Sequence, residues 1–152
     1  NIKNTFEKLF KLTSAQFKNL EITFVNEIND YKLFNYENEL IQALINILNN
    51  AKDALENKDT PKVIFIFTNK EENKIIIKIT DNAGGIDEKI IDKVCEPYFT
   101  TKHQAKGTGI GLFMTEEIIV KNLEGIFSIK NVNVDYKNKN YKGTEITIEL
   151  DS

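Results

Sequence analysis

Six glycines of this chain fall in three short clusters, at places where a phosphate or a planar ring could approach the main chain. The chain has 7 glycines in all. The clusters are Gly84 and Gly85 in Asp81-Asn82-Ala83-Gly84-Gly85-Ile86, Gly107, Gly109 and Gly111 in Gly107-Thr108-Gly109-Ile110-Gly111-Leu112, and Gly143 before Thr144. Glycine has no Cβ and adopts positive φ, so a ligand can lie directly against its backbone. The three clusters therefore indicate a nucleotide site.

Asp81 stands at the end of an expected strand, just before the first glycine pair. An ionised carboxylate only accepts hydrogen bonds. Adenine would offer it an exocyclic amine, whereas guanine would offer a repelling carbonyl oxygen. An aspartate here would select adenine, partly by rejecting guanine. An aspartate that merely closes a turn before Gly84 is the alternative that the sequence leaves open.

The second cluster, residues 107–112, opens an expected helix. The free N–H groups of a helix start, approached through glycines, can cradle an anion. The spacing does not fit the phosphate loop that ends in Lys-Ser or Lys-Thr, because neither pair follows. It does not fit the dinucleotide fingerprint either, since the glycines alternate and no strand leads directly into them.

Asn46, Asn50 and Asp53 lie on one face of a strongly apolar expected helix, at spacings of four and three residues. Asparagine is a poor helix former, and polar groups on such a helix need partners. Mg²⁺ prefers oxygen ligands and keeps phosphate oxygens and waters as the others, so it would suit the side-chain oxygen of Asn50. A solvated polar stripe is the alternative.

The elements that must position these residues form one expected domain of 152 residues. Periodicity predicts helices over residues 1–20, 39–55, 87–94 and 108–122, the last ended by Gly125. Strands are expected over 21–26, 63–68, 75–80, 126–130 and 144–150, with irregular polar segments at 96–106 and 131–142. Together these elements predict an α/β two-layer sandwich, in which a mixed sheet has helices on one face.

Composition limits the function classes. The chain is 41% hydrophobic and 28% charged, with a net charge of −3, so neither nucleic acid nor an anionic membrane is an obvious partner. All 20 basic residues are lysines, so phosphate contacts must come from lysine, backbone amides or a metal. Cys95 is the only cysteine, which fits a reducing compartment and a small buried side chain. The first residue is Asn1 rather than Met, so we expect a piece of a longer protein.

Together these segments resemble the GHKL, or Bergerat-fold, ATP-binding superfamily. Within it they look most like the catalytic domain of bacterial sensor histidine kinases of the nitrogen-regulation type. The N box resembles residues 46–51 and the F box resembles Glu96-Pro97-Tyr98-Phe99-Thr100-Thr101-Lys102. The three glycine boxes resemble residues 81–86, 107–112 and 143–144. The match runs in order from about residue 38 to 150 and implies a mostly antiparallel sheet with a flexible ATP lid.

The resemblance implies ATP and Mg²⁺ as ligands. Asp81 would hold the adenine amine with support from Thr144 through a water, Asn50 would bind Mg²⁺ beside Asn46, and Lys102 on the lid would meet the γ-phosphate. The implied catalytic residues are Asn46, Asn50 and Lys102. The implied nucleotide-binding residues are Asn50, Asp53, Asp81, Gly85, Ile86, Phe99, Thr101, Lys102, Gly107, Thr108, Gly109, Ile110, Gly111, Leu112 and Thr144.

One position separates the branches of the superfamily. Its hydrolases carry a glutamate one turn before the Mg²⁺-binding asparagine, whereas this chain has Asn46, whose amide is no general base. This substitution favours transfer of the γ-phosphoryl group to a protein side chain over hydrolysis. The only histidine, His103, lies in the expected lid and is interpreted as a solvated residue.

The acceptor histidine is therefore expected on a separate dimerisation domain, with a response regulator downstream of it. Residues 1–20 would be a linker or the end of the dimerisation helix, and 21–152 a monomeric catalytic domain in the cytoplasm. Two alternatives stay open: an anti-sigma-type serine kinase of the same fold, and a nucleotide-binding signalling module without transfer activity.

Overall fold

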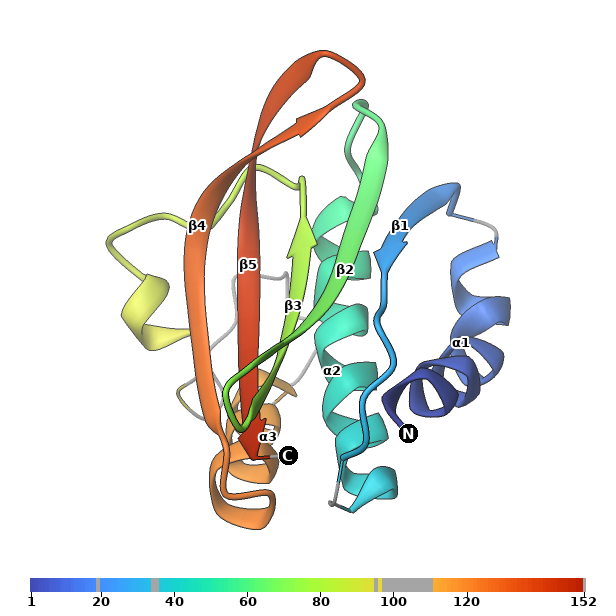
Figure 1. Ribbon diagram of the computed structural model, residues 1–152. Helices are drawn as coiled ribbons and strands as arrows, with labels where there is room; N and C mark the ends of the chain where they lie inside the picture. The colour runs from blue at the N-terminus through green and yellow to red at the C-terminus, as the bar shows by residue number, and fades with distance from the viewer. Residues whose placement is uncertain (19, 34–35, 95, 97–110, 152) are drawn as a thin grey trace.

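The computed structural model describes residues 1–18, 20–33, 36–94, 96 and 111–151 (Figure 1). The elements in chain order are α1 (Ile2–Lys18), β1 (Ile22–Glu27), α2 (Glu37–Leu55), β2 (Lys62–Glu71), β3 (Lys74–Asp81), the 3-10 turn η1 (Ile91–Lys93), α3 (Gly111–Glu117), the π-helical turn η2 (Ile118–Asn122), β4 (Ile126–Tyr136) and β5 (Lys139–Asp151).

The strands form one sheet in the order β1-β2-β3-β5-β4. β1 runs parallel to β2, with α2 in the connection between them, and every other neighbouring pair is antiparallel. In Figure 1, α2 and α3 lie behind the sheet and α1 lies beyond β1. The predicted mixed, mostly antiparallel α/β architecture is confirmed.

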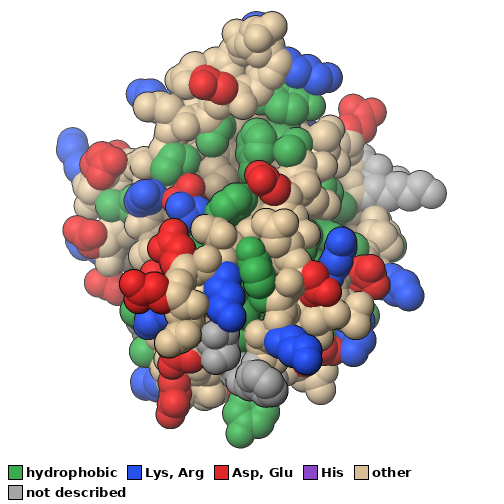
Figure 2. All heavy atoms as spheres, in the orientation of Figure 1, with side chains coloured by type: hydrophobic (Ala, Val, Ile, Leu, Met, Phe, Trp, Pro, Cys, Tyr) green, Lys and Arg blue, Asp and Glu red, His purple; other side chains and the backbone are tan. Residues whose placement is uncertain are grey.

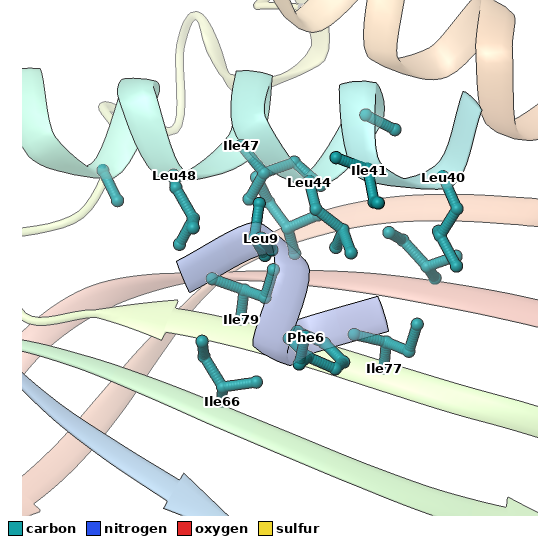
Figure 3. Close-up of a cluster of buried hydrophobic side chains, with 14 of the residues drawn as sticks. Phe6, Leu9, Leu40, Ile41, Leu44, Ile47, Leu48, Ile66, Ile77 and Ile79 are labelled. Carbon is teal, nitrogen blue, oxygen red and sulfur yellow. The ribbon is translucent and has the colours of Figure 1, made fainter. Parts of the chain in front are cut away.

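The core lies between the sheet and α2. The residues of β2, β3 and β5 that point to this side are aliphatic and buried, among them Ile66, Ile77 and Ile148. Figure 3 shows Leu44 and Ile47 of α2 directed at these strands. Burial of each such side chain stabilises the fold by about 1.5–3 kcal/mol. Because this stripe of α2 faces the sheet, its asparagine-bearing face is turned away from it.

Helix α1 packs into the same core. Phe6 and Leu9 are buried against α2 and the sheet (Figure 3). Phe17 lies edge-on to Phe24 of β1, with ring centroids 5.3 Å apart. The boundary expected near residue 20 stays a prediction, and this packing argues for placing α1 with the rest of the fold.

Lys8 of α1 is paired with Glu37 at the start of α2. The hydrogen bond from Lys8 lowers the pKa of the Glu37 carboxyl, against a smaller desolvation effect. Both side chains are exposed, so this pair is expected to add little stability.

The helix expected over residues 87–94 is wrong, because only a 3-10 turn at Ile91–Lys93 forms there. The side chain of Asp87 accepts a hydrogen bond from the Lys89 N–H at 2.9 Å. Its carbonyl also accepts from the Ile90 N–H at 2.9 Å. An aspartate that bonds its own following backbone competes with helix formation, and here it produces consecutive turns.

The polar excursion expected at 131–142 is also wrong. β4 and β5 stay paired as far as Tyr136 and Lys139, and close through a two-residue turn. Both turn residues, Lys137 and Asn138, have positive φ, at 48° and 65°. Two consecutive left-handed residues give the turn whose twist suits a hairpin. Tyr136 lies edge-on to Phe65 of β2 at 6.2 Å, so the end of the hairpin covers part of the outer face of the sheet.

The outer face of the sheet carries side chains of both charges. Figure 2 shows lysines and acidic residues interspersed with small apolar areas over this face. One such pair joins Lys130 of β4 to Glu145 of β5 at 3.6 Å. The visible surface therefore presents no broad region of a single sign.

Gly125 was expected to end the helix that includes α3, but the structure gives it another role. The left-handed residue there is Glu124, with φ of 54°, and the preceding turn is π-helical. Gly125 is needed for a different reason, because a Cβ on it would lie 2.6 Å from the Glu149 carbonyl oxygen. The glycine therefore allows close packing against β5 and does not provide the helix cap.

Candidate functional site

Three polar residues lie side by side across the sheet at the end of β3. Asp81 of β3 is opposite Thr144 of β5, and Thr144 is opposite Asn131 of β4. Asp81 and Thr144 lie on the face of the sheet that points toward α2. Ile79 and Ile146, two residues away on the same strands and the same face, belong to the core. Asp81 and Thr144 are buried. The sheet thus passes from an apolar core to a polar row at this end.

The Asp81 carboxylate is buried and bound by backbone amides. Its Oδ1 accepts a hydrogen bond from the Ala83 N–H at 3.0 Å. Burial raises the pKa of Asp81, while the amides of Ala83 and Thr144 and the charge of Lys58 act in the opposite direction. Because burial dominates, the surrounding protein groups do not fully replace water around this carboxylate. A ligand donor would do so, which is typical of a functional position.

Gly143 allows β5 to approach Asp81 at this point. A Cβ on Gly143 would lie 1.8 Å from the Asp81 carbonyl oxygen, far inside contact distance. The loop after Asp81 then turns back toward β5, where the Gly84 N–H bonds the Lys142 carbonyl at 2.8 Å. Gly84 and Gly85 have φ of 103° and 80°, which side chains other than glycine rarely adopt.

Two asparagines that the sequence did not single out hold this loop. Asn82 accepts from the Val63 N–H at 3.0 Å and donates to the Pro61 carbonyl at 2.7 Å. Asn131 accepts from the Ile86 N–H at 2.7 Å and donates to the Ile86 carbonyl. The charge of Lys58 also lies near this loop, with its Nζ 3.8 Å from the place of a Cβ on Gly84.

Gly111, the described glycine of the second cluster, lies against the asparagine face of α2. A Cβ on Gly111, the first residue of α3, would lie 3.7 Å from Asn50 Nδ2 and 4.0 Å from its Oδ1. The helix start is thus against Asn50, although the two residues are far apart in the sequence. Leu112, the next residue, packs half-buried against the core.

Asn46 and Asp53 lie on the same face of α2 as Asn50, and both are half-buried. Asn46 Oδ1 accepts a hydrogen bond from Gln42 Nε2 at 3.1 Å. α2 contacts both β3 and α3. In Figure 1, β3 and α2 run in the same direction, so Asp81 and the end of α2 that carries Asn50 lie toward the same end of the molecule.

The remaining expected ligands lie outside the described residues. These are Phe99, Thr101, Lys102, Gly107, Thr108, Gly109 and Ile110. His103 and Cys95, which are not expected to bind the nucleotide, also lie outside the described residues. Among the described residues no group of three or more His, Cys, Asp or Glu side chains could hold a metal ion. Within the same ranges no helix has the length and apolar character needed to cross a membrane.

The described geometry fits an adenine nucleotide. A buried carboxylate can accept a further hydrogen bond from a ligand, two left-handed glycines lie in the loop that follows it, and a glycine helix start adjoins an asparagine amide. Asn50 alone supplies one hard oxygen, so a Mg²⁺ ion here would take its other ligands from phosphate and water.

Comparison with known proteins gives a consistent result. Residues 35–152 match the family model described as histidine kinase-, DNA gyrase B-, and HSP90-like ATPase. The chain is 27% identical over 120 residues to the C4-dicarboxylate transport sensor protein DctB of Pseudomonas aeruginosa, covering 78% of this chain and 20% of DctB. It is 28% identical over 151 residues to a putative NtrY-like sensor histidine kinase of Rickettsia bellii, covering 86% of this chain and 24% of that protein.

The chain therefore spans about a quarter or less of the length of these two curated relatives. Among solved structures, the nucleotide-free catalytic domain of the histidine kinase ThkA superposes with a TM-score of 0.79 at 24% identity. That match covers 99% of this chain and 92% of the ThkA chain, so α1 falls within the shared fold.

Proposed function

Because this chain belongs to the family of histidine kinase-, DNA gyrase B- and HSP90-like ATPases, we propose that it is the catalytic domain of a two-component sensor histidine kinase. It binds Mg-ATP and donates the γ-phosphoryl group to a histidine of another domain. The observation that carries this proposal is the position of Asp81, which is buried, lies opposite Thr144 in the sheet and directly precedes the glycine turn.

Asp81 acts as the acceptor for the adenine amine, and its position beside Thr144 supports this role. The turn at Gly84 and Gly85 presents bare backbone to the base, and Ile86 supplies an apolar contact. Asn50 provides an oxygen for Mg²⁺, which when bound neutralises charge on the phosphate oxygens. Gly111 lets the start of α3 lie close to that region.

Asn46 favours transfer over hydrolysis. Its side-chain oxygen is bonded to Gln42, and an amide does not take up a proton near neutral pH. The site therefore orients the nucleotide, Asn46 supplies no general base to activate a water, and the attacking nitrogen belongs to the acceptor. A serine acceptor, as in anti-sigma-type kinases, and a signalling module without transfer are the alternatives.

The partners proposed for the chain follow from this role. The acceptor histidine lies on a dimerisation domain of the same kinase, which in turn passes the phosphoryl group to a response regulator in the cytoplasm. The chain by itself is monomeric. Residues 1–20 connect the catalytic fold to the dimerisation domain, and α1 within this segment packs against the core.

Calorimetric titration tests the proposal. ADP is titrated into the chain with and without Mg²⁺, with GDP as the control nucleotide. Binding of ADP that strengthens with Mg²⁺, with no binding of GDP, is the expected result. No binding of ADP under either condition would refute the proposed nucleotide site.

A transfer assay separates the acceptors. The chain, Mg²⁺ and γ-labelled ATP are incubated with a dimerisation domain that carries a histidine, and separately with a serine-bearing anti-sigma partner. Acid-labile label on the histidine domain alone supports the proposal. Acid-stable label on serine favours the first alternative, and normal ADP affinity with no label on either partner favours the second.

A further inference from the structure

We propose that Asn131 is a positioning residue for the adenine end of the site, acting by fixing the loop of Gly84, Gly85 and Ile86. This inference rests on the proposed nucleotide function and assigns a role to a residue outside the motifs. Asn131 lies on β4, 45 residues from the loop that it holds.

The side chain of Asn131 binds the backbone of Ile86 on both sides. Its Oδ1 accepts from the Ile86 N–H at 2.7 Å, and its Nδ2 donates to the Ile86 carbonyl. Two residues of adjacent antiparallel strands exchange the same pair of bonds. The Asn131 side-chain amide therefore makes the two hydrogen bonds to Ile86 that a neighbouring strand would otherwise make. Nδ2 also donates to Glu88 Oε1 at 2.9 Å.

Gly85 fits closely against this amide. A Cβ on Gly85 would lie 3.0 Å from Asn131 Oδ1 and 3.4 Å from its Cγ. The glycine thus has two requirements, its φ of 80° and its contact with Asn131. The second requirement links the glycine motif to a residue that the sequence pattern alone does not mark.

The position of Asn131 in the sheet connects this contact to the nucleotide. Asn131 is the neighbour of Thr144, and Thr144 is the neighbour of Asp81. A loop with two glycines has many conformations when it is not held, and ordering it on binding reduces affinity. Because Asn131 holds Ile86 before the nucleotide arrives, it keeps the loop and Asp81 in register.

The test compares Asn131→Ala with Asn133→Ala, a control two residues further along the same strand at an exposed position. ADP affinity is measured by calorimetry with Mg²⁺ present, and the exchange rate of the Ile86 amide hydrogen is measured without nucleotide. Asn131→Ala is expected to raise the Kd for ADP about tenfold, from the loss of the two hydrogen bonds to the Ile86 backbone, and to speed exchange at Ile86. Asn133→Ala should change neither.

A charge variant distinguishes positioning from a general loss of packing. Asn131→Asp keeps the size of the side chain but turns a carboxylate toward the Ile86 carbonyl and Glu88. We expect it to bind ADP more weakly than Asn131→Ala, and we expect added Glu88→Gln to restore part of the loss. If Asn131 only filled space in the packing, the ADP affinity of Asn131→Asp would not respond to Glu88→Gln.

Two results would overturn the inference. One is an unchanged Kd in Asn131→Ala, and the other is equal weakening in both Asn131 variants with no effect of Glu88→Gln. The amide exchange at Ile86 does not need a nucleotide. The wild type could therefore bind no ADP while Asn131→Ala still loses protection at the Ile86 amide. That combination would refute the proposed function but establish the contact between Asn131 and Ile86.

Discussion

Alanine at Gly143 should loosen the sheet at the site itself. The added Cβ would lie 1.8 Å from the Asp81 carbonyl oxygen and 2.9 Å from the carbonyl carbon of the same residue. Both are backbone atoms, so no side-chain rotation can relieve the contact. To bring the 1.8 Å distance to an ordinary 3.4 Å, β3 and β5 must separate locally by about 1.6 Å.

Such a separation breaks the hydrogen bonds between the strands there, because a bond near 2.9 Å cannot stretch that far. Overpacking costs about 1–3 kcal/mol and a lost bond about 1 kcal/mol. We therefore expect Gly143→Ala to lower the free energy of unfolding by about 2–4 kcal/mol. The variant should remain folded and should bind ADP weakly, since Asp81 is displaced.

The matched control is Gly111→Ala, whose new Cβ would meet, among the described residues, only Asn50, at 3.7 Å or more. Alanine is the better helix former, so this variant should keep or gain up to about 1 kcal/mol of stability. Urea unfolding followed by circular dichroism measures both variants. Equal stability of Gly143→Ala and the wild type would refute the steric argument.

Four further predictions concern Asp81, Asn50 and Phe6. Asp81→Asn should weaken ADP binding about 10- to 100-fold in calorimetry, the equivalent of one charge-assisted hydrogen bond; unchanged affinity would reject the adenine role. Because the pKa of Asp81 is raised, wild-type ADP affinity should be full above that pKa and should fall as the pH drops through it. The stability of the nucleotide-free chain should instead increase as the pH falls from the raised pKa toward the ordinary value of 3.8. Asp81→Asn should show neither pH dependence. Asn50→Asp should change the Mg²⁺ dependence of ADP binding more than its affinity without Mg²⁺, and identical Mg²⁺ titrations would exclude Asn50 as a ligand. Phe6→Ala should cost about 3–5 kcal/mol in urea unfolding, and a loss below 1 kcal/mol would mean that α1 is not part of the core.

The apolar patterns in the sequence predicted the main elements well. α2 follows from a stripe of aliphatic residues such as Leu44 and Leu48. β3 follows from a short isoleucine-rich run, and β5 follows from alternating aliphatic residues. In each case the side chains that create the pattern are the ones the structure buries. Hydrophobic periodicity is local in the sequence, so it can be read without knowledge of the partner.

The sequence-based predictions of the fold were wrong where side chains bond to the backbone, and where a strand shows no regular alternation. Asp87 replaced an expected helix with turns through a bond to its own backbone. The β4–β5 hairpin was hidden by its lysines and asparagines, because its half-buried residues, Val132, Val134 and Tyr136, face the opposite side of the sheet from Ile129. A strand whose buried side changes midway shows no single alternation.

The candidate site could be predicted only in part, for a similar reason. Asp81 and Gly85 were marked by their motif, and the structure places them beside Thr144 and Asn131, although their binding roles stay predictions. Asn131 carried no such mark because its importance depends on contacts made 45 residues away. The contact between Asn131 and Ile86 becomes visible only once the structure places β4 beside β5 and the loop.

The pairing of β3 with β5 also has a consequence for how the chain folds. β2 with β3, and β4 with β5, are hairpins of neighbouring segments, so each can form early from local contacts. Joining them requires residues such as Asp81 and Thr144 to meet across a long intervening stretch, and such distant pairings form slowly. The polar row lies on this junction, so we expect it to be complete only when the last large step of folding is complete. Nucleotide binding would then act selectively on fully assembled molecules, and partly folded chains would gain nothing from it.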